Sequence, residues 1–555
     1  MRGWEHRGSA GRLRRQSFRV RYCSVLLAAT LGAGLLTGCS DGGDSESSDA
    51  VGGASDVYYE IFVRSFYDSD GDGIGDLRGV IEKLDYLNDG DPKTDGDLGV
   101  SGLWLMPIQP SPSYHGYDVT DYYGVNPEYG TMEDFKELSA EASKRGMKVI
   151  IDLVVNHTSV EHPWFEDSAS GKDSEHRDWY LWAEDTGQDT GGASAASGGR
   201  AWHLRGGSHY LAGFWEGMPD LNFDNQEVRS EMVKIGRYWL DAGAAGFRLD
   251  AAKHIYEDLQ TASAADKKAL QEKNVAWWQE FRDGLTSEGG EAPYLVGEIW
   301  DNSPVVIAPY LNDALDSGFN FSLAEQLLAA AKSGTSSSAA SMVGRIHALY
   351  EKSSGGAYVD APFLANHDQP RVMSQLEGDA EKAKMAASLL LTMPGRPFLY
   401  YGEEIGMAGK KPDERIREPF AWYADPAGGP GQTSWERSAY SKGGEFSVES
   451  QTDAPESLLS HYRKLIRIRG EEPLLRDGAI DSYGVKDSRV MAYTRTGEED
   501  DTQRLLVLHN LSSEEVSVPL GEDEGWEMVV FSSRESMKIE DGSLTLPAYT
   551  TVVVK

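Results

Sequence analysis

Cysteine is nearly absent from this sequence of 555 residues, and its only two cysteines, Cys23 and Cys39, lie close to the N-terminus. The chain beyond Cys39 therefore contains no disulfide bond. Basic residues are scarce as well, because 53 Lys and Arg residues face 89 Asp and Glu residues, which gives a net charge of −36. A surface this acidic repels a phosphate backbone, so we expect no nucleic-acid partner, while neutral substrates remain open.

Long apolar runs are missing near the N-terminus too. The run from Val25 to Leu36 is too short to span a bilayer comfortably, but it is typical of the core of a signal peptide. Residues 1–21 before it carry seven Arg and one Glu. The run ends in Leu36-Thr37-Gly38-Cys39, which resembles a bacterial lipobox and implies cleavage before Cys39 and lipid attachment to that cysteine.

We therefore predict a lipoprotein signal peptide over residues 1–38 and a flexible linker, rich in Ser, Gly and Asp, over residues 39–55. The protein would be exported and anchored by lipid to a bacterial membrane, on its periplasmic or cell-surface face. A plain secretory signal or a wrongly assigned start is the alternative.

From Asp56 onward, short apolar runs alternate with amphipathic stretches, which implies βα units and a parallel sheet. Eight such units would close into a (β/α)₈ TIM barrel, and an open doubly wound sheet is the alternative. The expected strands are 57–63, 102–106, 148–155, 246–249, 294–299, 358–364 and 398–401, and the clearest helices are 77–87, 131–145 and 227–242.

Two stretches depart from this alternation. Residues 157–221, rich in Gly, Ser, Trp and His, predict a subdomain inserted after the third strand. From residue 475 to 555 short alternating runs predict an antiparallel β domain. The barrel would then comprise residues 56–156 and 222–474, so the expected fold class is α/β.

Polar clusters end four of the expected strands, at residues 152–157, 246–250, 296–300 and 363–368. Any one acid at such a place could simply cap the following helix. At the carboxyl ends of barrel strands, however, all four clusters would converge on one rim. Two carboxylates there suit glycoside hydrolysis, in which one acid protonates the leaving oxygen.

These four segments resemble the four sequence signatures of the α-amylase family of retaining glycoside hydrolases. A fifth, Met218-Pro219-Asp220-Leu221-Asn222, resembles the extra signature of the group between α-amylases and oligo-1,6-glucosidases. The resemblance covers the chain from about residue 56 to its end. It implies a (β/α)₈ barrel, a small insertion after strand three and a C-terminal β-sandwich.

Carried over residue by residue, the resemblance implies that Asp250 is the nucleophile, Glu298 the general acid/base and Asp368 the third carboxylate, which holds the sugar hydroxyls. Arg248 lies two residues before Asp250 on one strand, so both side chains face the same way, and its charge would keep Asp250 ionised. Residues expected to contact the sugar are Tyr117, His157, Arg248, Lys253, His254 and His367.

A Gly-rich loop carries carboxylates at Asp68, Asp70, Asp72 and Asp76, the hard oxygen ligands that suit Ca²⁺. An EF-hand would need Glu at its twelfth position, which is Gly79 here. The family resemblance instead implies a calcium loop that also uses the carbonyl of Ile74. A solvated acidic turn is the alternative.

A second calcium is implied less directly. Asn156, Asp220 and the carbonyl of His254 match the metal site that typical α-amylases hold between the barrel and the insertion. Oligoglucosidases keep the Asn and the Asp without that metal.

The specificity signals are mixed. Lys253 and His254 resemble α-amylase residues that contact sugars beyond the cut, whereas the loop over residues 411–420 resembles oligo-1,6-glucosidases. We predict a monomeric α-amylase that cleaves internal α-1,4 bonds of α-glucans. An oligo-1,6-glucosidase, an α-glucosidase or a maltodextrin-producing exo-enzyme is the alternative. A non-catalytic glucan-binding lipoprotein is disfavoured because all three carboxylates are present.

Overall fold

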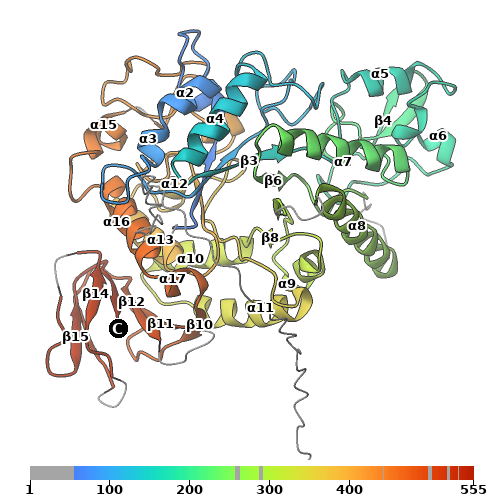
Figure 1. Cartoon of the computed structure of the whole chain (residues 1–555). Coiled ribbons are helices and arrows are strands. Elements are labelled where there is room, and N and C mark those ends of the chain that lie inside the picture. The colour runs from blue at the N-terminus through green and yellow to red at the C-terminus, as the bar shows by residue number, and fades with distance from the viewer. Residues whose placement is uncertain are drawn as a thin grey trace, which may run out of the picture. The chain divides into compact units, whose positions relative to one another are not determined.

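The computed structural model describes residues 55–256, 263–286, 292–441, 443–497, 503–521, 525–534 and 537–555 (Figure 1). The predicted signal peptide, Cys39 and the predicted linker up to residue 54 lie outside the described residues. Within the described ranges, no helix combines the length and apolar character that crossing a membrane requires.

A parallel sheet forms the centre of the fold and closes into a barrel. Its strands follow the order β8-β7-β6-β3-β2-β1-β9. Parallel bridges from Phe319 to Ala361 and from Phe363 to Phe398 insert the segment 361–363 between β8 and β9, which completes the ring with an eighth strand. The named strands are β1 (Tyr58–Ile61), β2 (Gly102–Leu105), β3 (Lys148–Leu153), β6 (Gly246–Leu249), β7 (Tyr294–Gly297), β8 (Ser317–Gly318) and β9 (Phe398–Tyr400).

The barrel confirms the expected fold class, with three local differences from the sequence prediction. The strand predicted over 57–63 ends at Ile61, and the chain turns into the short helix α1 (Val63–Phe66). The run predicted over 358–364 is present only as the bridged segment 361–363. Strand β8 was not predicted, because two residues, Ser317 and Gly318, carry no apolar run.

Amphipathic helices cover the barrel. Helix α4 shows why: Thr131 and Asp134 form a capping box at its start, and Phe135, Leu138 and Ala142 recur on the buried face. The barrel helices are α2 (Leu77–Glu82), α3 (Leu84–Leu87), α4 (Met132–Lys144), α7 (Gln226–Asp241), α8 (Ala264–Leu285), α9 (Pro304–Ile307), α10 (Phe321–Ser333), α11 (Ala339–Ser354), α12 (Val372–Gln375), α13 (Ala380–Leu391), α14 (Asp413–Ile416), α15 (Val448–Gln451), α16 (Leu458–Glu471) and α17 (Leu474–Asp477), with 3₁₀ turns η2 (Ala308–Leu311) and η3 (Gly444–Phe446).

A separate group of short elements interrupts the barrel between β3 and α7. It contains α5 (Pro163–Ser170), η1 (Arg177–Trp179), α6 (Ala183–Thr186) and the hairpin β4 (Trp202–Arg205) and β5 (Ser208–Leu211). Bridges from His157 to Asp220 and from Tyr180 to Leu221 close its base. This is where the insertion was expected, although its predicted boundaries remain predictions.

The C-terminal part is an antiparallel β domain of two sheets. The larger has the order β10-β11-β12-β16-β14 and the smaller pairs β13 with β15. Leu506, Leu508, Leu544 and Leu546 belong to the apolar core that the two sheets share, which makes the domain a sandwich. The strands are β10 (Ala479–Ser482), β11 (Val490–Thr496), β12 (Arg504–Asn510), β13 (Val516–Pro519), β14 (Val529–Ser532), β15 (Ser543–Leu546) and β16 (Thr551–Val554).

Two buried arginines lie where this domain meets the barrel, and one of them, Arg495, joins the two. Arg469 on α16 donates to the carbonyls of Leu391, Met393 and Leu475, and Arg495 on β11 donates to those of Thr392 and Leu475. Burial lowers the pKa of Arg469 to about 9 and that of Arg495 to about 10. Backbone carbonyls therefore compensate the buried charges at this junction.

Candidate active site

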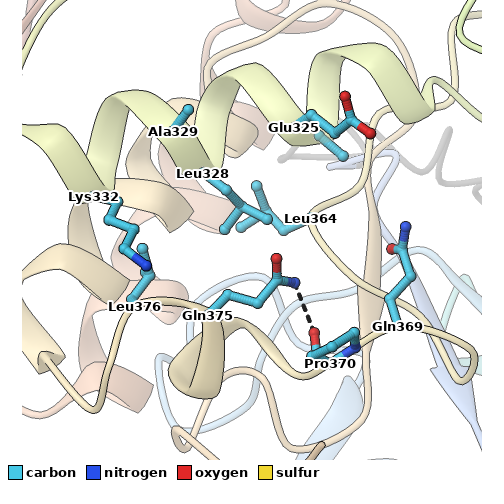
Figure 2. Close-up of a pocket in the computed structure, with 10 residues that line it drawn as sticks. Glu325, Leu328, Ala329, Lys332, Leu364, Gln369, Pro370, Gln375 and Leu376 are labelled. Carbon is cyan, nitrogen blue, oxygen red and sulfur yellow. Dashed lines mark hydrogen bonds between the residues drawn. The ribbon is translucent and has the colours of Figure 1, made fainter. Parts of the chain in front are cut away.

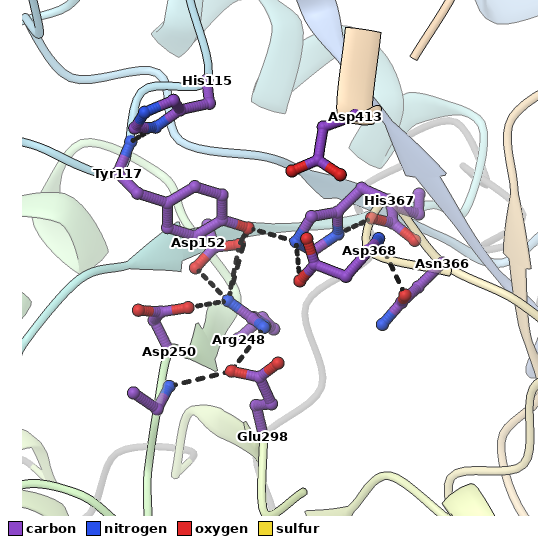
Figure 3. A network of polar contacts seen from close by, with 12 residues as sticks. His115, Tyr117, Asp152, Arg248, Asp250, Glu298, Asn366, His367, Asp368 and Asp413 are labelled. Carbon is purple, nitrogen blue, oxygen red and sulfur yellow. Dashed lines mark hydrogen bonds and ion pairs between the residues drawn. The ribbon is translucent and has the colours of Figure 1, made fainter. Parts of the chain in front are cut away.

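The predicted site residues meet at the carboxyl ends of the barrel strands. Asp152 lies near the end of β3, Asp250 directly follows β6, and Glu298 directly follows β7. His367 and Asp368 follow the bridged segment 361–363. Figure 3 shows these side chains directed toward one another. The parallel sheet explains the convergence, because all of its strands end at the same rim.

Arg248, on β6, is the centre of this cluster. Its Nη1 lies 2.6 Å from Asp250 Oδ1 and 3.0 Å from Asp152 Oδ1, and its Nη2 lies 3.0 Å from Glu298 Oε2. The guanidinium is almost completely buried, so these contacts are poorly screened by water. One cation thus holds three carboxyl groups in a fixed arrangement.

The backbone after Asp250 is shaped to contact Glu298. Ala251 has a φ of 48°, in the left-handed region that costs a non-glycine residue about 1 kcal/mol. In this conformation the N–H of Ala251 donates to Glu298 Oε2 at 3.0 Å, and the N–H of Ala252 donates to the Glu298 carbonyl at 3.0 Å. The local strain therefore positions one predicted catalytic carboxyl against the loop that carries the other.

Burial and neighbouring charges act in opposite directions on these carboxyls. Burial raises the pKa of Glu298, and the nearby Asp250 and Asp368 raise it further, against the effect of Arg248. Burial also raises the pKa of Asp250 above its usual value, and contact with Arg248 offsets part of this increase. Burial raises the pKa of Asp152 to about 7. Glu298 thus has the environment of a proton donor, while Arg248 lies closer to Asp250, at 2.6 Å, than to Glu298, at 3.0 Å.

A second polar cluster continues from Asp368. His367 Nε2 lies 3.2 Å from Asp368 Oδ2 and 2.7 Å from the hydroxyl of Tyr117, and His367 Nδ1 lies 2.5 Å from Glu60 Oε1. Arg417 Nη2 lies 2.9 Å from Asp368 Oδ1. Burial opposes ionisation of Asp368, but the cations of His367 and Arg417 outweigh it and hold its pKa well below the usual range.

Glu60 and Arg417 were not among the predicted site residues. Glu60 is the only charged residue of the buried strand β1, which is a signal that the sequence did offer. Arg417 lies in the loop over residues 411–420, which the sequence linked to specificity, but nothing in the sequence indicated its contact with Asp368. Both residues reach the site through the fold, from β1 and from the end of α14.

The other predicted sugar-binding residues line the same region. His157 is buried, with Nε2 at 3.1 Å from the Tyr117 carbonyl and Nδ1 at 3.0 Å from Asn156 Oδ1, and burial lowers its pKa to about 4. Lys253 donates to the carbonyl of Trp300 at 2.6 Å. Burial lowers the pKa of His254 to about 4 as well. The two histidines are therefore neutral near pH 7.

The acidic loop partly matches the predicted calcium ligands. Carboxylate oxygens of Asp68, Asp70 and Asp76 lie within 4.8 Å of one another. Asp72 is outside this group, and its exposed carboxylate accepts the N–H of Ile74 at 2.7 Å, so its role as a ligand stays a prediction. Asp68 and Asp76 are largely buried, and none of the ion pairs found in the described part of the chain involves the three grouped carboxylates. Such a donor set fits a hard divalent cation.

The second predicted metal site has a direct contact instead. Asn156 Nδ2 donates to the His254 carbonyl at 2.6 Å, and Asp220 Oδ2 accepts the N–H of Gly213 at 3.1 Å. The structure thus links the Asn156 side chain to the His254 carbonyl across the base of the insertion. A calcium ion at this place stays a prediction.

A hollow of about 330 Å³ lies beside the cluster, between α10 and the chain that follows Asp368 (Figure 2). Leu328 and Leu364 form its apolar centre, and the Gln375 side chain donates to the Pro370 carbonyl. Gln369, next to Asp368, belongs to its rim. The hollow therefore adjoins the carboxyl cluster without containing it.

An eight-stranded barrel whose rim gathers buried carboxyls around one guanidinium has the architecture expected of a glycoside hydrolase. The alpha-amylase catalytic-domain family model matches residues 60–478, and the C-terminal domain model of alpha-amylase SusG matches residues 490–553. The chain therefore belongs to the alpha-amylase family of glycoside hydrolases.

Several relatives span nearly the whole folded part. Alpha-amylase 3 of Dictyoglomus thermophilum is 41% identical over 500 residues, which cover 90% of this chain and 93% of that protein. An oligo-1,6-glucosidase of Parageobacillus thermoglucosidasius is 32% identical and covers 82% of this chain and 90% of its own length. The crystal structure of an alpha-amylase from H. orenii superposes with a TM-score of 0.81 at 48% identity, covering 90% of this chain and 98% of that one.

Proposed function

We propose that this enzyme is an α-amylase that hydrolyses internal α-1,4 bonds of starch and maltodextrins with retention of anomeric configuration. The observation that carries the proposal is the bridge that Arg248 forms between Asp250 and Glu298. A single planar group that contacts both carboxyls keeps them close, as a retaining pair requires. The similarity to two alpha-amylases supports the substrate class.

In the proposed mechanism, Asp250 attacks the anomeric carbon while Glu298 protonates the leaving oxygen. The glycosyl–Asp250 ester is then hydrolysed by a water that Glu298 activates as a base. Arg248 favours the ionised form of Asp250, and burial favours the protonated form of Glu298. Asp368, kept ionised by His367 and Arg417, is available to accept hydrogen bonds from the sugar hydroxyls.

The preference for internal bonds rests on the region beyond the scissile bond. Lys253 is fixed by the Trp300 carbonyl and by Asp301, and Trp300 is half-exposed and stacks on Phe321 with ring centroids 4.9 Å apart. A fixed cation and an open aromatic face suit sugar units of the leaving chain. The alternative, an oligo-1,6-glucosidase, is favoured by the resemblance of the 411–420 loop to such enzymes. Arg417 of this loop contacts Asp368.

We expect maltose and maltotriose from starch, with the α-anomer formed first and little or no hydrolysis of isomaltose. Product analysis on starch, pullulan, isomaltose and reducing-end-labelled maltotriose, with NMR directly after cleavage, tests this. Fast hydrolysis of isomaltose without attack on starch would establish the oligo-1,6-glucosidase instead. An initial β-product would mean inversion and a wider separation of the carboxyls.

We also propose that the acidic loop over residues 68–76 binds Ca²⁺ through Asp68, Asp70 and Asp76. Three carboxylates of one sign, two of them largely buried, repel one another unless a cation neutralises them. When bound, the ion would tie the loop after α1 to the start of α2, where Asp76 accepts the Gly79 N–H at 2.7 Å.

A matched pair of variants tests the calcium proposal. Asp70 and Asp72 are both exposed and each accepts a backbone N–H two residues ahead, but only Asp70 belongs to the grouped carboxylates. Chelator should lower the melting temperature of the wild type and of Asp72→Asn, whereas Asp70→Asn should respond much less, because ligand binding stabilises the native state. Equal responses of the two variants to chelator and added Ca²⁺ would contradict the assignment.

The proposed location is the periplasmic or cell-surface face of a bacterial membrane, with the lipid on Cys39. The lipobox-like Leu36-Thr37-Gly38-Cys39 sequence supports this proposal. The full-length precursor expressed in a bacterium should partition with membranes, and Cys39→Ala should move the activity to the soluble fraction. Cys39→Ala protein that still sediments with membranes would exclude the lipid anchor.

A further inference from the structure

Both ring nitrogens of His367 face carboxylates. Nδ1 lies 2.5 Å from Glu60 Oε1 and Nε2 lies 3.2 Å from Asp368 Oδ2. Ionised carboxylates only accept hydrogen bonds, and a neutral imidazole has a single N–H. With both carboxyls ionised, the ring can satisfy them only as an imidazolium that donates in two directions. Burial raises the pKa of Glu60, and the charge and hydrogen bond of His367 act against this increase.

The hydroxyl of Tyr117 is consistent with this state. It donates to Asp152 Oδ2 at 2.9 Å, so its oxygen is left to accept from His367 Nε2 at 2.7 Å. His367 is fully buried, which by itself disfavours the imidazolium, yet Asp368 and Glu60 raise the pKa of His367 to about 10. Burial alone, without the charge of the Glu60 carboxylate, would favour the neutral ring of His367.

From this arrangement we propose that Glu60 is a positioning residue: through His367 it fixes the carboxylate of Asp368 in the ionised form and orientation needed against the sugar. The proposal rests on the proposed glycosidase function of Asp250, Glu298 and Asp368. Glu60 touches neither the reacting atoms nor the sugar, because it lies on β1 behind the imidazole and is almost completely buried.

The charges around His367 come from several elements of the barrel. Besides Glu60 on β1, the facing groups are Tyr117, Asp152, Arg248, Asp250, Asp368 and Arg417. Arg248 and Arg417 are cations, so they oppose a further positive charge on the ring. Glu60 is therefore the partner that balances the imidazolium on the face opposite the substrate, while Asp368 remains free to interact with the sugar.

Substitution of Glu60 by Gln keeps the shape and an acceptor oxygen but removes the charge. The pKa of His367 should then fall, and above this new value the neutral ring can no longer donate to both neighbours. We expect kcat to drop about tenfold or more with little change in KM. The alkaline limb of the pH profile should move to lower pH. Glu60→Asp keeps the charge and should retain the wild-type limb even where its shorter side chain lowers kcat.

Glu404→Gln is the matched control. Glu404 is also a fully buried carboxyl, and its Oε1 accepts from the hydroxyls of Tyr59 and Tyr86 at 2.7 Å each, away from His367. The pH profiles of kcat and kcat/KM are compared on a 4-nitrophenyl α-maltooligoside. Unshifted limbs in both Gln variants would overturn the role of Glu60. An inactive wild type would instead contradict the proposed function.

A direct measurement covers the case in which Glu60→Gln does not fold. In wild-type protein labelled with ¹⁵N-histidine, one histidine should remain doubly protonated at about pH 8.5, well above the ordinary histidine pKa. His367→Asn, made only to assign the signal, should remove it. If no imidazolium signal persists at that pH, or if Glu60→Gln leaves its titration unchanged, the proposal is wrong.

Discussion

Glu298→Gln is expected to lower kcat on maltooligosaccharides about 10³-fold with the fold intact, because protonation of the leaving oxygen and activation of water are both lost. The amide preserves the shape of the side chain, and it can still accept the Ala251 N–H that Glu298 Oε2 now accepts. Thermal unfolding and circular dichroism should therefore stay close to those of the wild type. Turnover near the wild-type rate would remove Glu298 from its role.

The same variant can identify the nucleophile. α-Maltosyl fluoride has a leaving group that departs without a proton, so Glu298→Gln should still form the glycosyl–enzyme ester but hydrolyse it slowly. Mass spectrometry should then find one maltosyl group on the protein, in the peptide that contains Asp250. The control is Asp250→Asn, which should take up no label and should be inactive on both substrates. A label on any other residue would contradict the assignment of Asp250.

The rim of the barrel was predictable because its signals are local. Arg248 and Asp250 share a face by strand alternation, and in the structure Arg248 Nη1 lies 2.6 Å from Asp250 Oδ1. The closing strand β8 was not predictable, since its two residues are strand only because β7 and the 361–363 segment lie beside them. Tertiary structure decides such short strands, and sequence propensity does not.

The spatial grouping of the carboxylates in the acidic loop over residues 68–76 was less predictable from the sequence. Alternate spacing suggested that Asp68, Asp70, Asp72 and Asp76 act together. The structure groups Asp68, Asp70 and Asp76, whereas Asp72 lies outside the group although it accepts a backbone N–H two residues ahead just as Asp70 does. Spacing gives the side on which a residue lies only in a regular strand or helix.

Arg248→Met should lower kcat as much as loss of the general acid does, for a different reason. Asp152, Asp250 and Glu298 would lose their shared buried cation, and breaking a buried charge network of this kind costs about 3–5 kcal/mol of stability. We expect a fall in kcat of about 10³-fold, because loss of the cation raises the pKa of Asp250 and favours its protonated form, which is a poor nucleophile. Urea unfolding and steady-state kinetics measure the two effects.

The pH profile separates this catalytic effect from instability. Arg248 lowers the pKa of both Asp250 and Glu298, so its removal raises both pKa values. Asp250 must be ionised and Glu298 protonated, which moves the acid limb and the alkaline limb of kcat/KM to higher pH. Arg371→Met is the control: Arg371 is also buried, but it donates to the carbonyls of Ile416 and Tyr401. Arg371→Met should lose stability while both limbs of its kcat/KM profile stay in place. If the limbs of Arg248→Met stay in place or move to lower pH, the role assigned to Arg248 is contradicted.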